Sequence, residues 1–579
     1  MHSRTMAWLT AALITGTCVS LAFTQAVARD KRDRGQPAPD HEEVVRDFAR
    51  AEFEKGRRVF RYETFGDEVW WGDALQLHRA LEGSAHGGVG SGVSPATALA
   101  VGLKVDVDAL PQSLQLKLKR GLVDLADPAT TLALLKLDAV VGVTGRFNPD
   151  GTLKTMGIQC ALCHSTVDNS LAPGIGRRLD GWANRDLDVG AIVGLAPRLE
   201  PMAEQLGVDV ATVRTVLASW GPGKFDAALV LDGKAFGPDG KSGATLIPPA
   251  FGLGGINLHT WTGWGSVPHW NAFVAVLEMH GQGSFQDARL DNAAQFPLAA
   301  RNRLGHVTHE PDRVSSLLPA LHYYQLSLPA PAPPSGSFDQ AAATRGEVTF
   351  NGKARCASCH TRDLGSEPGW NMHRAADIGV DAFQADRSPE HAYRTAPLKG
   401  LWTHMTGGFY HDGRFATLLD VVNHYDGFFR LGLAAGEKSD VVEYLKSLSD
   451  DVPTSVRDRA SLNQEAGSTE QATAPAERTG GLSIWPLPAT AGAGVQIGFL
   501  SPARTAGKLP ADLKVSVYDL GGRRVAEIGT GAQPAEHAMI TVTWDGKDSD
   551  GAVTVPGVYF VRASAPSVGF QTGRRIVVR

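Results

Sequence analysis

The chain has 579 residues, enough for several domains, and its 43% hydrophobic and 20% charged residues are typical of a soluble globular protein. Its formal net charge at pH 7 is −5 and no basic stripe is present, so nucleic acid is not expected as a partner. Residues 1–28 combine Arg4, an apolar stretch and a small-residue end at Ala28. This pattern predicts a secretory signal peptide, with a membrane anchor as the alternative. No later stretch has the eighteen or so uninterrupted apolar residues of a stable membrane span.

A disordered lead is predicted over residues 29–42, and residues 43–60 have apolar side chains at helical spacing. In this helix Gly56 and Phe60 stand four apart, as Gly346 and Phe350 do in a second helix predicted over 339–350. We infer one helical module that is used twice, with residues 61–155 inserted in the first copy. Coincidence is the alternative.

Four of the five cysteines form two Cys-x-x-Cys-His motifs, and the fifth lies in the predicted signal peptide. Two thiols one helical turn apart reach the two vinyl groups of one porphyrin, and the histidine that follows reaches its iron. A structural zinc site or a redox dithiol would not explain a histidine directly after both pairs. The sequence therefore predicts two covalently attached haems c with His164 and His360 as proximal ligands. The cofactor-binding residues are Cys160, Cys163 and His164 in the first motif and Cys356, Cys359 and His360 in the second.

The remaining segments complete a multidomain organisation. A Pro-rich break occupies residues 331–336, a helix is predicted over 437–448, and residues 451–481 lack periodicity and aromatic side chains. Short β-branched runs separated by turn residues follow. We predict mainly α, cytochrome c-like haem domains followed by an all-β immunoglobulin-like sandwich. The predicted boundaries are 1–28 for the signal peptide, 29–42 for the lead, 43–330 for the N-terminal haem c domain with its large insertion, 339–450 for the C-terminal cytochrome c domain, 451–481 for the linker and 482–579 for the sandwich.

Residues 394–448 contain Arg-Thr-Ala-Pro-Leu (394–398), Tyr-His-Asp-Gly (410–413) and Ala-Thr-Leu (416–418). With these motifs, residues 339–448 resemble the C-terminal haem domain of the bacterial di-haem cytochrome c peroxidase and MauG family. The family places an axial haem ligand fourteen positions after the histidine of the second motif. The resemblance implies Tyr425 as that ligand, as in MauG, where the peroxidases have Met. Rival ligands are Met405, His404, Met372 and His373, and a core tyrosine is the other interpretation of Tyr425.

The first haem has no nearby candidate for a sixth ligand, because no histidine follows His164 until His259. An open iron would bind peroxide or oxygen. Glu278 is the candidate general acid/base for cleaving an O–O bond, and Trp264, with two neighbouring tryptophans, is a candidate to shield a haem or lie between the two. The histidines 259, 269 and 280 are alternative ligands that would close the site, and core packing is the other interpretation of each residue.

The C-terminal region contains VYDLGGR (517–523), Trp-Asp-Gly (544–546) and GVYF (557–560). With these residues it resembles the FlgD-like immunoglobulin-type domain and the type IX secretion sorting domains. Such modules deliver or attach proteins at the cell surface. The loop Asp545–Asp550 is a candidate calcium site, and a tight polar turn is the alternative.

Three functions are compatible with these features. The favoured one is an exported peroxidase- or MauG-like oxidoreductase, located in the periplasm or at the cell surface, with a reactive N-terminal haem and a C-terminal relay haem. Its expected partners are hydrogen peroxide or oxygen and a small redox protein that donates or accepts electrons. The alternatives are a non-catalytic di-haem electron carrier and an oxygenase like the di-haem rubber oxygenases.

Overall fold

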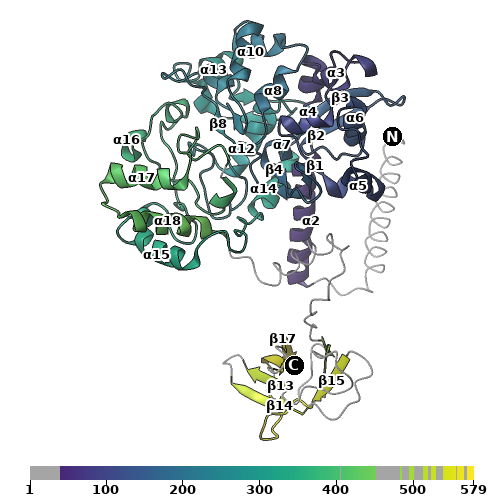
Figure 1. Ribbon diagram of the computed structural model, residues 1–579, viewed down its shortest axis with the longest axis vertical. Coiled ribbons are helices and arrows are strands. Elements are labelled where there is room, and N and C mark those ends of the chain that lie inside the picture. Colours follow the sequence, from purple (N-terminus) through teal and green to yellow (C-terminus); the bar gives the residue numbers. More distant parts are fainter. Residues whose placement is uncertain are drawn as a thin grey trace, which may run out of the picture. The chain divides into compact units, whose positions relative to one another are not determined.

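The structure is a computed structural model that describes residues 40–404, 406–450, 483–485, 495–500, 513–519, 523–529, 539–555, 557–565 and 570–578. The predicted signal peptide, the linker over 451–481 and Met405 therefore lie outside the described residues, as does most of the lead. The chain divides into two compact units, Met1–Pro453 and Thr454–Arg579. The first is mainly helical and the second is built of strands (Figure 1). Among the described helices, none is long and apolar enough to span a membrane.

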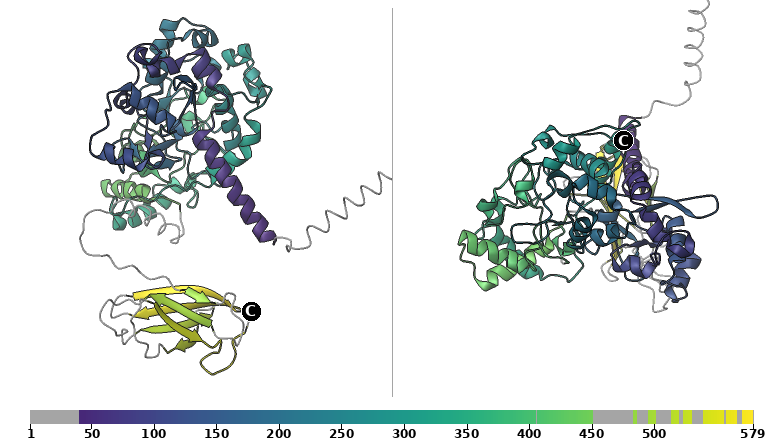
Figure 2. Two further views of the ribbon diagram at one scale, coloured as in Figure 1. Left: turned by 90° about the vertical axis from the view of Figure 1, so that its right-hand side faces the viewer. Right: turned by 90° about the horizontal axis from the view of Figure 1, so that it is seen from above.

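The first unit begins with a long helix, α2 (His41–Tyr62), which starts inside the segment predicted as a disordered lead. Its N-terminal turns project from the rest of the unit (Figure 2), and its C-terminal half crosses α14 (Leu318–Leu326). At the crossing a Cβ added to Gly56 would lie 2.0 Å from the carbonyl oxygen of Ala320. One turn further on, Phe60 packs against Tyr324 with ring centroids 5.6 Å apart. Only glycine permits so close an approach of two helix backbones.

The same crossing occurs between α15 (Gln340–Asn351) and α18 (Ala435–Ser447), which lie side by side in Figure 1. A Cβ added to Gly346 would lie 2.0 Å from the carbonyl oxygen of Asp440. Phe350 then packs against Tyr444 at 5.2 Å. The Gly–Phe spacing that suggested a repeat thus marks two helix pairs with matching contacts.

Between α2 and α14 the chain forms short helices and small two-stranded sheets around an apolar core. The described helices are α3 (Leu77–Glu82), α4 (Pro95–Ala100), α5 (Gln112–Lys119), α6 (Pro128–Lys136), α7 (Ala161–His164), α8 (Val189–Gly194), α9 (Glu200–Leu206), α10 (Val210–Ala218), α11 (Leu229–Asp232), α12 (Val267–Phe273) and α13 (Pro297–Asn302), and the later part adds α16 (Ala375–Ile378) and α17 (Leu418–Phe429). The strand pairs are β1 (Val105–Asp106) with β5 (Ile175–Gly176), β2 (Val143–Phe147) with β3 (Leu153–Ile158), β4 (Ser165–Val167) with β6 (Arg178–Asp180), β7 (Lys224–Phe225) with β8 (Thr245–Leu246), and β9 (Phe285–Gln286) with β10 (His306–Val307).

A buried ion cluster joins the segments 43–330 and 339–450, which were predicted as two haem domains and which lie in one compact unit. The guanidinium of Arg387 lies 2.9 Å from Asp226 and 2.8 Å from Asp232, and all three side chains are at most 1% exposed. Burial raises the pKa of Asp226 to about 6, although the charge of Arg387 opposes the shift. A charge cluster this deep holds its partners together, because separating them would leave an uncompensated buried charge.

The second unit contains a three-stranded sheet in the order β11-β12-β15 and a four-stranded sheet in the order β14-β13-β16-β17. Buried residues from both sheets form one core, in which Trp544 packs against Tyr559 at 5.8 Å. This arrangement is that of a β-sandwich. The strands are β11 (Ser483–Trp485), β12 (Val495–Leu500), β13 (Lys514–Asp519), β14 (Arg524–Ile528), β15 (Met539–Trp544), β16 (Gly557–Ala565) and β17 (Phe570–Val578).

The candidate calcium loop of this unit has the hydrogen bonds of a tight turn. Asp545 accepts a hydrogen bond from the backbone N–H of Lys547, and Asp548 accepts from those of Asp550 and Ala552. The side chains thus stabilise the turn that the sequence suggested as the alternative to a calcium site.

Candidate functional site

The first Cys-x-x-Cys-His motif lies at the end of β3 and forms the short helix α7. The backbone N–H of His164 donates to the carbonyl of Cys160 at 3.2 Å, which closes one helical turn. Cys160 and Cys163 therefore lie on one helical turn, and His164 follows Cys163 directly. Burial raises the pKa of each of the two thiols to about 12.

The imidazole of His164 is fixed by a single backbone contact. Its Nδ1 donates to the carbonyl oxygen of Pro248 at 3.1 Å, and burial lowers its pKa to about 4. The ring is therefore neutral at pH 7, with its proton on Nδ1 and a free lone pair on Nε2. This is the tautomer of a histidine that ligates a metal through Nε2.

The second motif follows α15 and repeats this geometry. The backbone N–H of His360 donates to the carbonyl of Cys356 at 3.0 Å, and its Nδ1 donates to the carbonyl of Gly365 at 3.0 Å. Burial lowers the pKa of His360 and raises that of the Cys356 thiol to about 11. Both motifs thus present two thiols and a histidine whose Nε2 lone pair is free.

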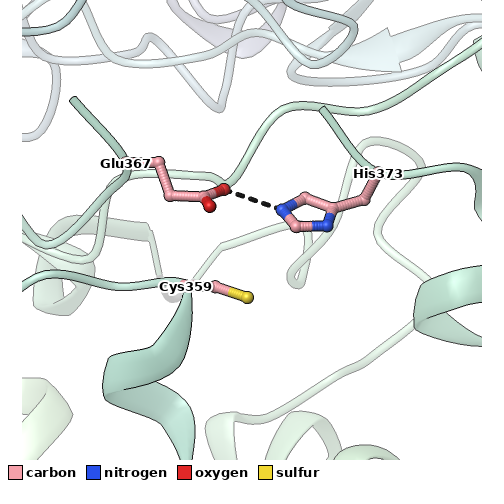
Figure 3. Close-up of side chains that lie close together, drawn as sticks. All are labelled: Cys359, Glu367 and His373. Carbon is pink, nitrogen blue, oxygen red and sulfur yellow. Dashed lines mark hydrogen bonds and ion pairs between the residues drawn. The ribbon is translucent and has the colours of Figure 1, made fainter. Parts of the chain in front are cut away.

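Cys359 lies close to two further groups that could bind a metal, Glu367 and His373 (Figure 3). His373 Nε2 is 2.7 Å from Glu367 and 2.9 Å from the hydroxyl of Thr395. These contacts occupy His373, a rival axial ligand in the sequence analysis, and they brace the loop whose Gly365 carbonyl holds His360. The contact between His373 and Glu367 is therefore best explained as support for the second motif.

The second motif opens into a cavity of about 310 Å³, and Cys356, Cys359 and His360 form part of its wall. Tyr425, from α17, and His404 also line it. Burial raises the pKa of Tyr425, and both cysteines lie near enough to add to the shift. His404 is buried, its Nε2 has no hydrogen-bond partner, and burial lowers its pKa to about 3. With His373, three of the axial-ligand candidates from the sequence analysis therefore line this cavity.

Glu278 lies near the first motif, at the end of a π-helical turn, Val274–Glu278. The residues just before it, Val276 and Leu277, share a buried core with Ala161 of the motif. The charge of Glu278 also raises the pKa of the Cys163 thiol, after burial itself. Burial raises the pKa of Glu278 well above its usual range, with Asp226 as a second cause, and its Oε1 has no hydrogen-bond partner. A raised pKa favours the protonated form of this carboxyl, which can donate its proton.

Trp264 belongs to the core that packs beside the first motif. It is 5% exposed and makes edge contacts with Trp270 at 5.2 Å and Phe273 at 5.8 Å. The guanidinium of Arg289 lies over its ring at 5.5 Å. These contacts are those of a packed core residue, while its predicted role beside a haem stays a prediction.

Two of the three histidines proposed to close the first site are held elsewhere. His259 Nε2 donates to the carbonyl of Ile256 at 2.9 Å. His280 stacks on Trp70 with ring centroids 3.8 Å apart, and burial lowers its pKa to about 3. His269 packs edge-on against Trp264 at 5.7 Å.

The residues at both motifs fit covalent haem better than a thiolate-bound metal. Thiolate ligands are found where the thiol pKa is lowered, whereas burial here raises the pKa of Cys160, Cys163 and Cys356. A thiol that adds to a vinyl group becomes an uncharged thioether, so no buried charge results. The cavity beside the second motif and the partnerless Nε2 of His404 also suit a large, mainly apolar group with a central metal.

Sequence reasoning missed the residues that hold these sites in place. The carbonyls of Pro248 and Gly365 left no signal, since every residue has a carbonyl. The Asp226–Asp232–Arg387 cluster left only a weak signal in the sequence, which is that Asp226 and Asp232 flank the apolar run AALVL.

Comparison with known proteins finds similarity in two parts of the chain. Residues 496–569 match the FlgD Ig-like domain. A segment of 94 residues is 33% identical to the methylamine utilization protein MauG of Methylorubrum extorquens, and it covers 15% of this chain and 25% of that protein. The chain thus matches only about a quarter of the length of this relative.

A solved structure of PorZ, a bacterial surface component of the type-IX secretion system of Porphyromonas gingivalis, is 22% identical over 17% of this chain and 11% of its own. Its TM-score of 0.12 is too low to support an inference. The chain therefore combines a region similar to MauG with a C-terminal region similar to the FlgD Ig-like domain.

Proposed function

We propose that this protein is an exported di-haem c-type cytochrome that acts as a peroxidase- or MauG-type oxidoreductase. The observation that carries the proposal is the paired geometry of the two Cys-x-x-Cys-His turns. In each, the histidine Nδ1 donates to a backbone carbonyl, at 3.1 Å for His164 and 3.0 Å for His360, and Nε2 stays free. The similarity to MauG supports a di-haem, peroxidase-like function at the level of the family.

Haem iron, when bound, supplies one-electron chemistry and a position for peroxide or oxygen. The chain supplies the proton. Glu278 lies near Cys163 with a pKa raised well above its usual range, which favours a protonated carboxyl that could protonate a leaving oxygen. Its unpartnered Oε1 leaves the group free to turn toward a substrate.

The second site is suited to a relay. Tyr425 and His404 line its cavity, and either side chain would close a haem there against small ligands. The first motif has Glu278 near it, and a carboxylic acid at that position is suited to donating a proton rather than to binding the iron. This difference favours a reactive N-terminal site and a closed C-terminal site.

The proposed location is the periplasm or the cell surface. The support is the signal-peptide pattern of residues 1–28 together with the FlgD Ig-like match over 496–569. A small redox protein is the proposed electron donor or acceptor.

The test is a comparison of the full-length protein with two double variants, Cys160→Ala/Cys163→Ala and Cys356→Ala/Cys359→Ala. Mass spectrometry should find two covalent haems in the parent and one in each variant. Electron paramagnetic resonance should then find a high-spin, ligand-accessible haem that only the first double variant loses. Peroxide turnover should be lost in the first double variant and should also fall in the second, because the second haem supplies the electrons. Two low-spin haems that bind neither cyanide nor peroxide would instead identify an electron carrier. Turnover with oxygen but no peroxide would identify an oxygenase, and a parent without covalent haem would refute the whole proposal.

A further inference from the structure

Two arginines line the cavity beside the second motif without a carboxylate partner. Arg185 is 6% exposed, and its Nε and Nη1 have no hydrogen-bond partner. Arg394 donates from Nε to the carbonyl of Thr260, but its Nη1 has no partner. Within the described part of the chain, neither guanidinium forms an ion pair. Lys399, which lines the same cavity, differs in that it pairs with Asp450 at 2.7 Å.

A buried arginine that has carboxylate partners provides an internal comparison. Arg387 is as deeply buried, yet its pKa is raised, because Asp226 and Asp232 compensate its charge. Burial alone lowers the pKa of Arg185 and of Arg394 from 12.5 to about 10. That change is a loss of proton affinity of roughly 300-fold, at tenfold per pKa unit. Both side chains are still cations at pH 7, so each needs an anion that the described residues do not supply.

The cavity limits what that anion can be. It is shared with Cys356, Cys359 and His360, so the group that occupies it is the one attached to this motif. Haem carries two propionate carboxylates on the porphyrin edge away from the thioether-forming vinyl groups. A guanidinium matches a carboxylate with two parallel hydrogen bonds. Two unpartnered guanidiniums therefore match two carboxylates in number, charge and geometry.

We propose that Arg185 and Arg394 bind the two propionates of the haem attached to Cys356 and Cys359. This inference rests on the proposed function, since it requires a haem at the second motif. It assigns a role to a residue far from that motif in sequence, because Arg185 belongs to the segment that carries the first motif. Asn184, its neighbour, donates its backbone N–H to the carbonyl of Cys163 at 2.9 Å. The first motif thus positions a charge for the second haem.

The electrical consequence is a raised reduction potential for the second haem. A buried cation favours the electron-rich, reduced state of a nearby centre. Paired propionates also stay ionised across the neutral pH range, because the guanidinium stabilises their charged form. The potential of this haem should therefore change little between pH 6 and 8.

The test is spectroelectrochemical titration of the full-length protein and of four variants, Arg185→Met, Arg394→Met, Arg185→Gln and Arg394→Gln. Each should lower one of the two midpoint potentials, so that the ratio of reduced to oxidised haem at a fixed potential falls roughly tenfold, or about 59 mV for one electron. The same potential should become pH-dependent between pH 6 and 8, since an unpaired propionate titrates there. The glutamine variants keep a donor in the same space and carry the same prediction if a methionine variant fails to fold.

Arg362→Met is the matched control, because Arg362 lies two residues from His360 but its side chain is 73% exposed. At a fixed potential, it should change the ratio of reduced to oxidised haem by less than threefold for either haem. The propionate assignment is wrong if the protein holds two covalent haems and none of the four variants changes the ratio of reduced to oxidised haem by more than threefold. If the parent holds no haem at the second motif, the proposed function fails instead.

Discussion

Replacing Arg387 by methionine should destabilise the first unit strongly. Arg387 is fully buried and donates to Asp226 and Asp232 at distances from 2.8 to 3.2 Å. Arg387→Met keeps much of the side-chain volume but leaves two buried carboxylates without a cation. Breaking a buried ion pair from one side typically costs about 3–5 kcal/mol of unfolding free energy. We expect a loss of that size at pH 7.

The pH dependence of this loss has a definite sign. The pKa of Asp226 is about 6 against an ordinary 3.8, so the folded state holds this proton more tightly than the unfolded state. Stability from this group therefore falls as the pH rises from 3.8 toward 6, by about 3 kcal/mol at ~1.4 kcal/mol per pKa unit. Without Arg387 the pKa of Asp226 rises further. The deficit of Arg387→Met should thus be largest at pH 7 and smaller at pH 5.

Urea unfolding of the full-length protein, followed by far-ultraviolet circular dichroism at both pH values, measures this difference. Arg345→Met is the control, because Arg345 makes a two-point contact with Asp440 on the surface, with its side chain 62% exposed. Its removal should leave the urea midpoint nearly unchanged. A loss below about 1 kcal/mol for Arg387→Met, or a larger loss at pH 5 than at pH 7, would refute the reasoning.

Three further predictions concern the sites and the helix crossings. Glu278→Gln should lower peroxide turnover roughly 100-fold or more and remove the loss of activity at high pH, because the amide cannot donate the raised-pKa proton; an unchanged pH–rate profile would exclude Glu278 as the acid. Tyr425→Phe should change the low-spin electron paramagnetic resonance signal of the second haem, and an unaltered signal would point to His404 instead. Gly346→Ala should lower the melting temperature of the first unit, because its Cβ would lie 2.0 Å from the Asp440 carbonyl oxygen. Gly427→Ala, where no atom lies within 4 Å of the added Cβ, is the matched control for this third prediction and should not lower it.

The sequence allowed prediction of features that depend on local spacing. The Cys-x-x-Cys-His turns and the helices that carry Gly56 and Gly346 follow from patterns within a few residues. Two details of the structure differ from the prediction. The helix α2 begins at His41, inside the predicted lead. The β-branched runs of the C-terminal region did not include the strands β11 and β14. The short strand β14 carries Arg524 and Glu527, whose charges mask its β pattern.

Features that depend on chain segments meeting in space could not be predicted. Arg387 lies 161 residues from Asp226 and 155 from Asp232, and nothing in either local sequence names the partner. The carbonyl that orients His164 belongs to Pro248, 84 residues away. Tyr425 was placed by resemblance alone, and the structure adds that its side chain lines the second cavity.

Pro248 belongs to both sites. Its carbonyl accepts a hydrogen bond from His164, and Pro248 also lines the cavity of the second motif. An imidazole gains donor strength from such a hydrogen bond, so the wall of one site sets the basicity of the ligand in the other. Neither site is therefore transferable by itself. A designer who transplanted the first motif into another scaffold would have to carry residues 245–251 with it, and with them part of the second site.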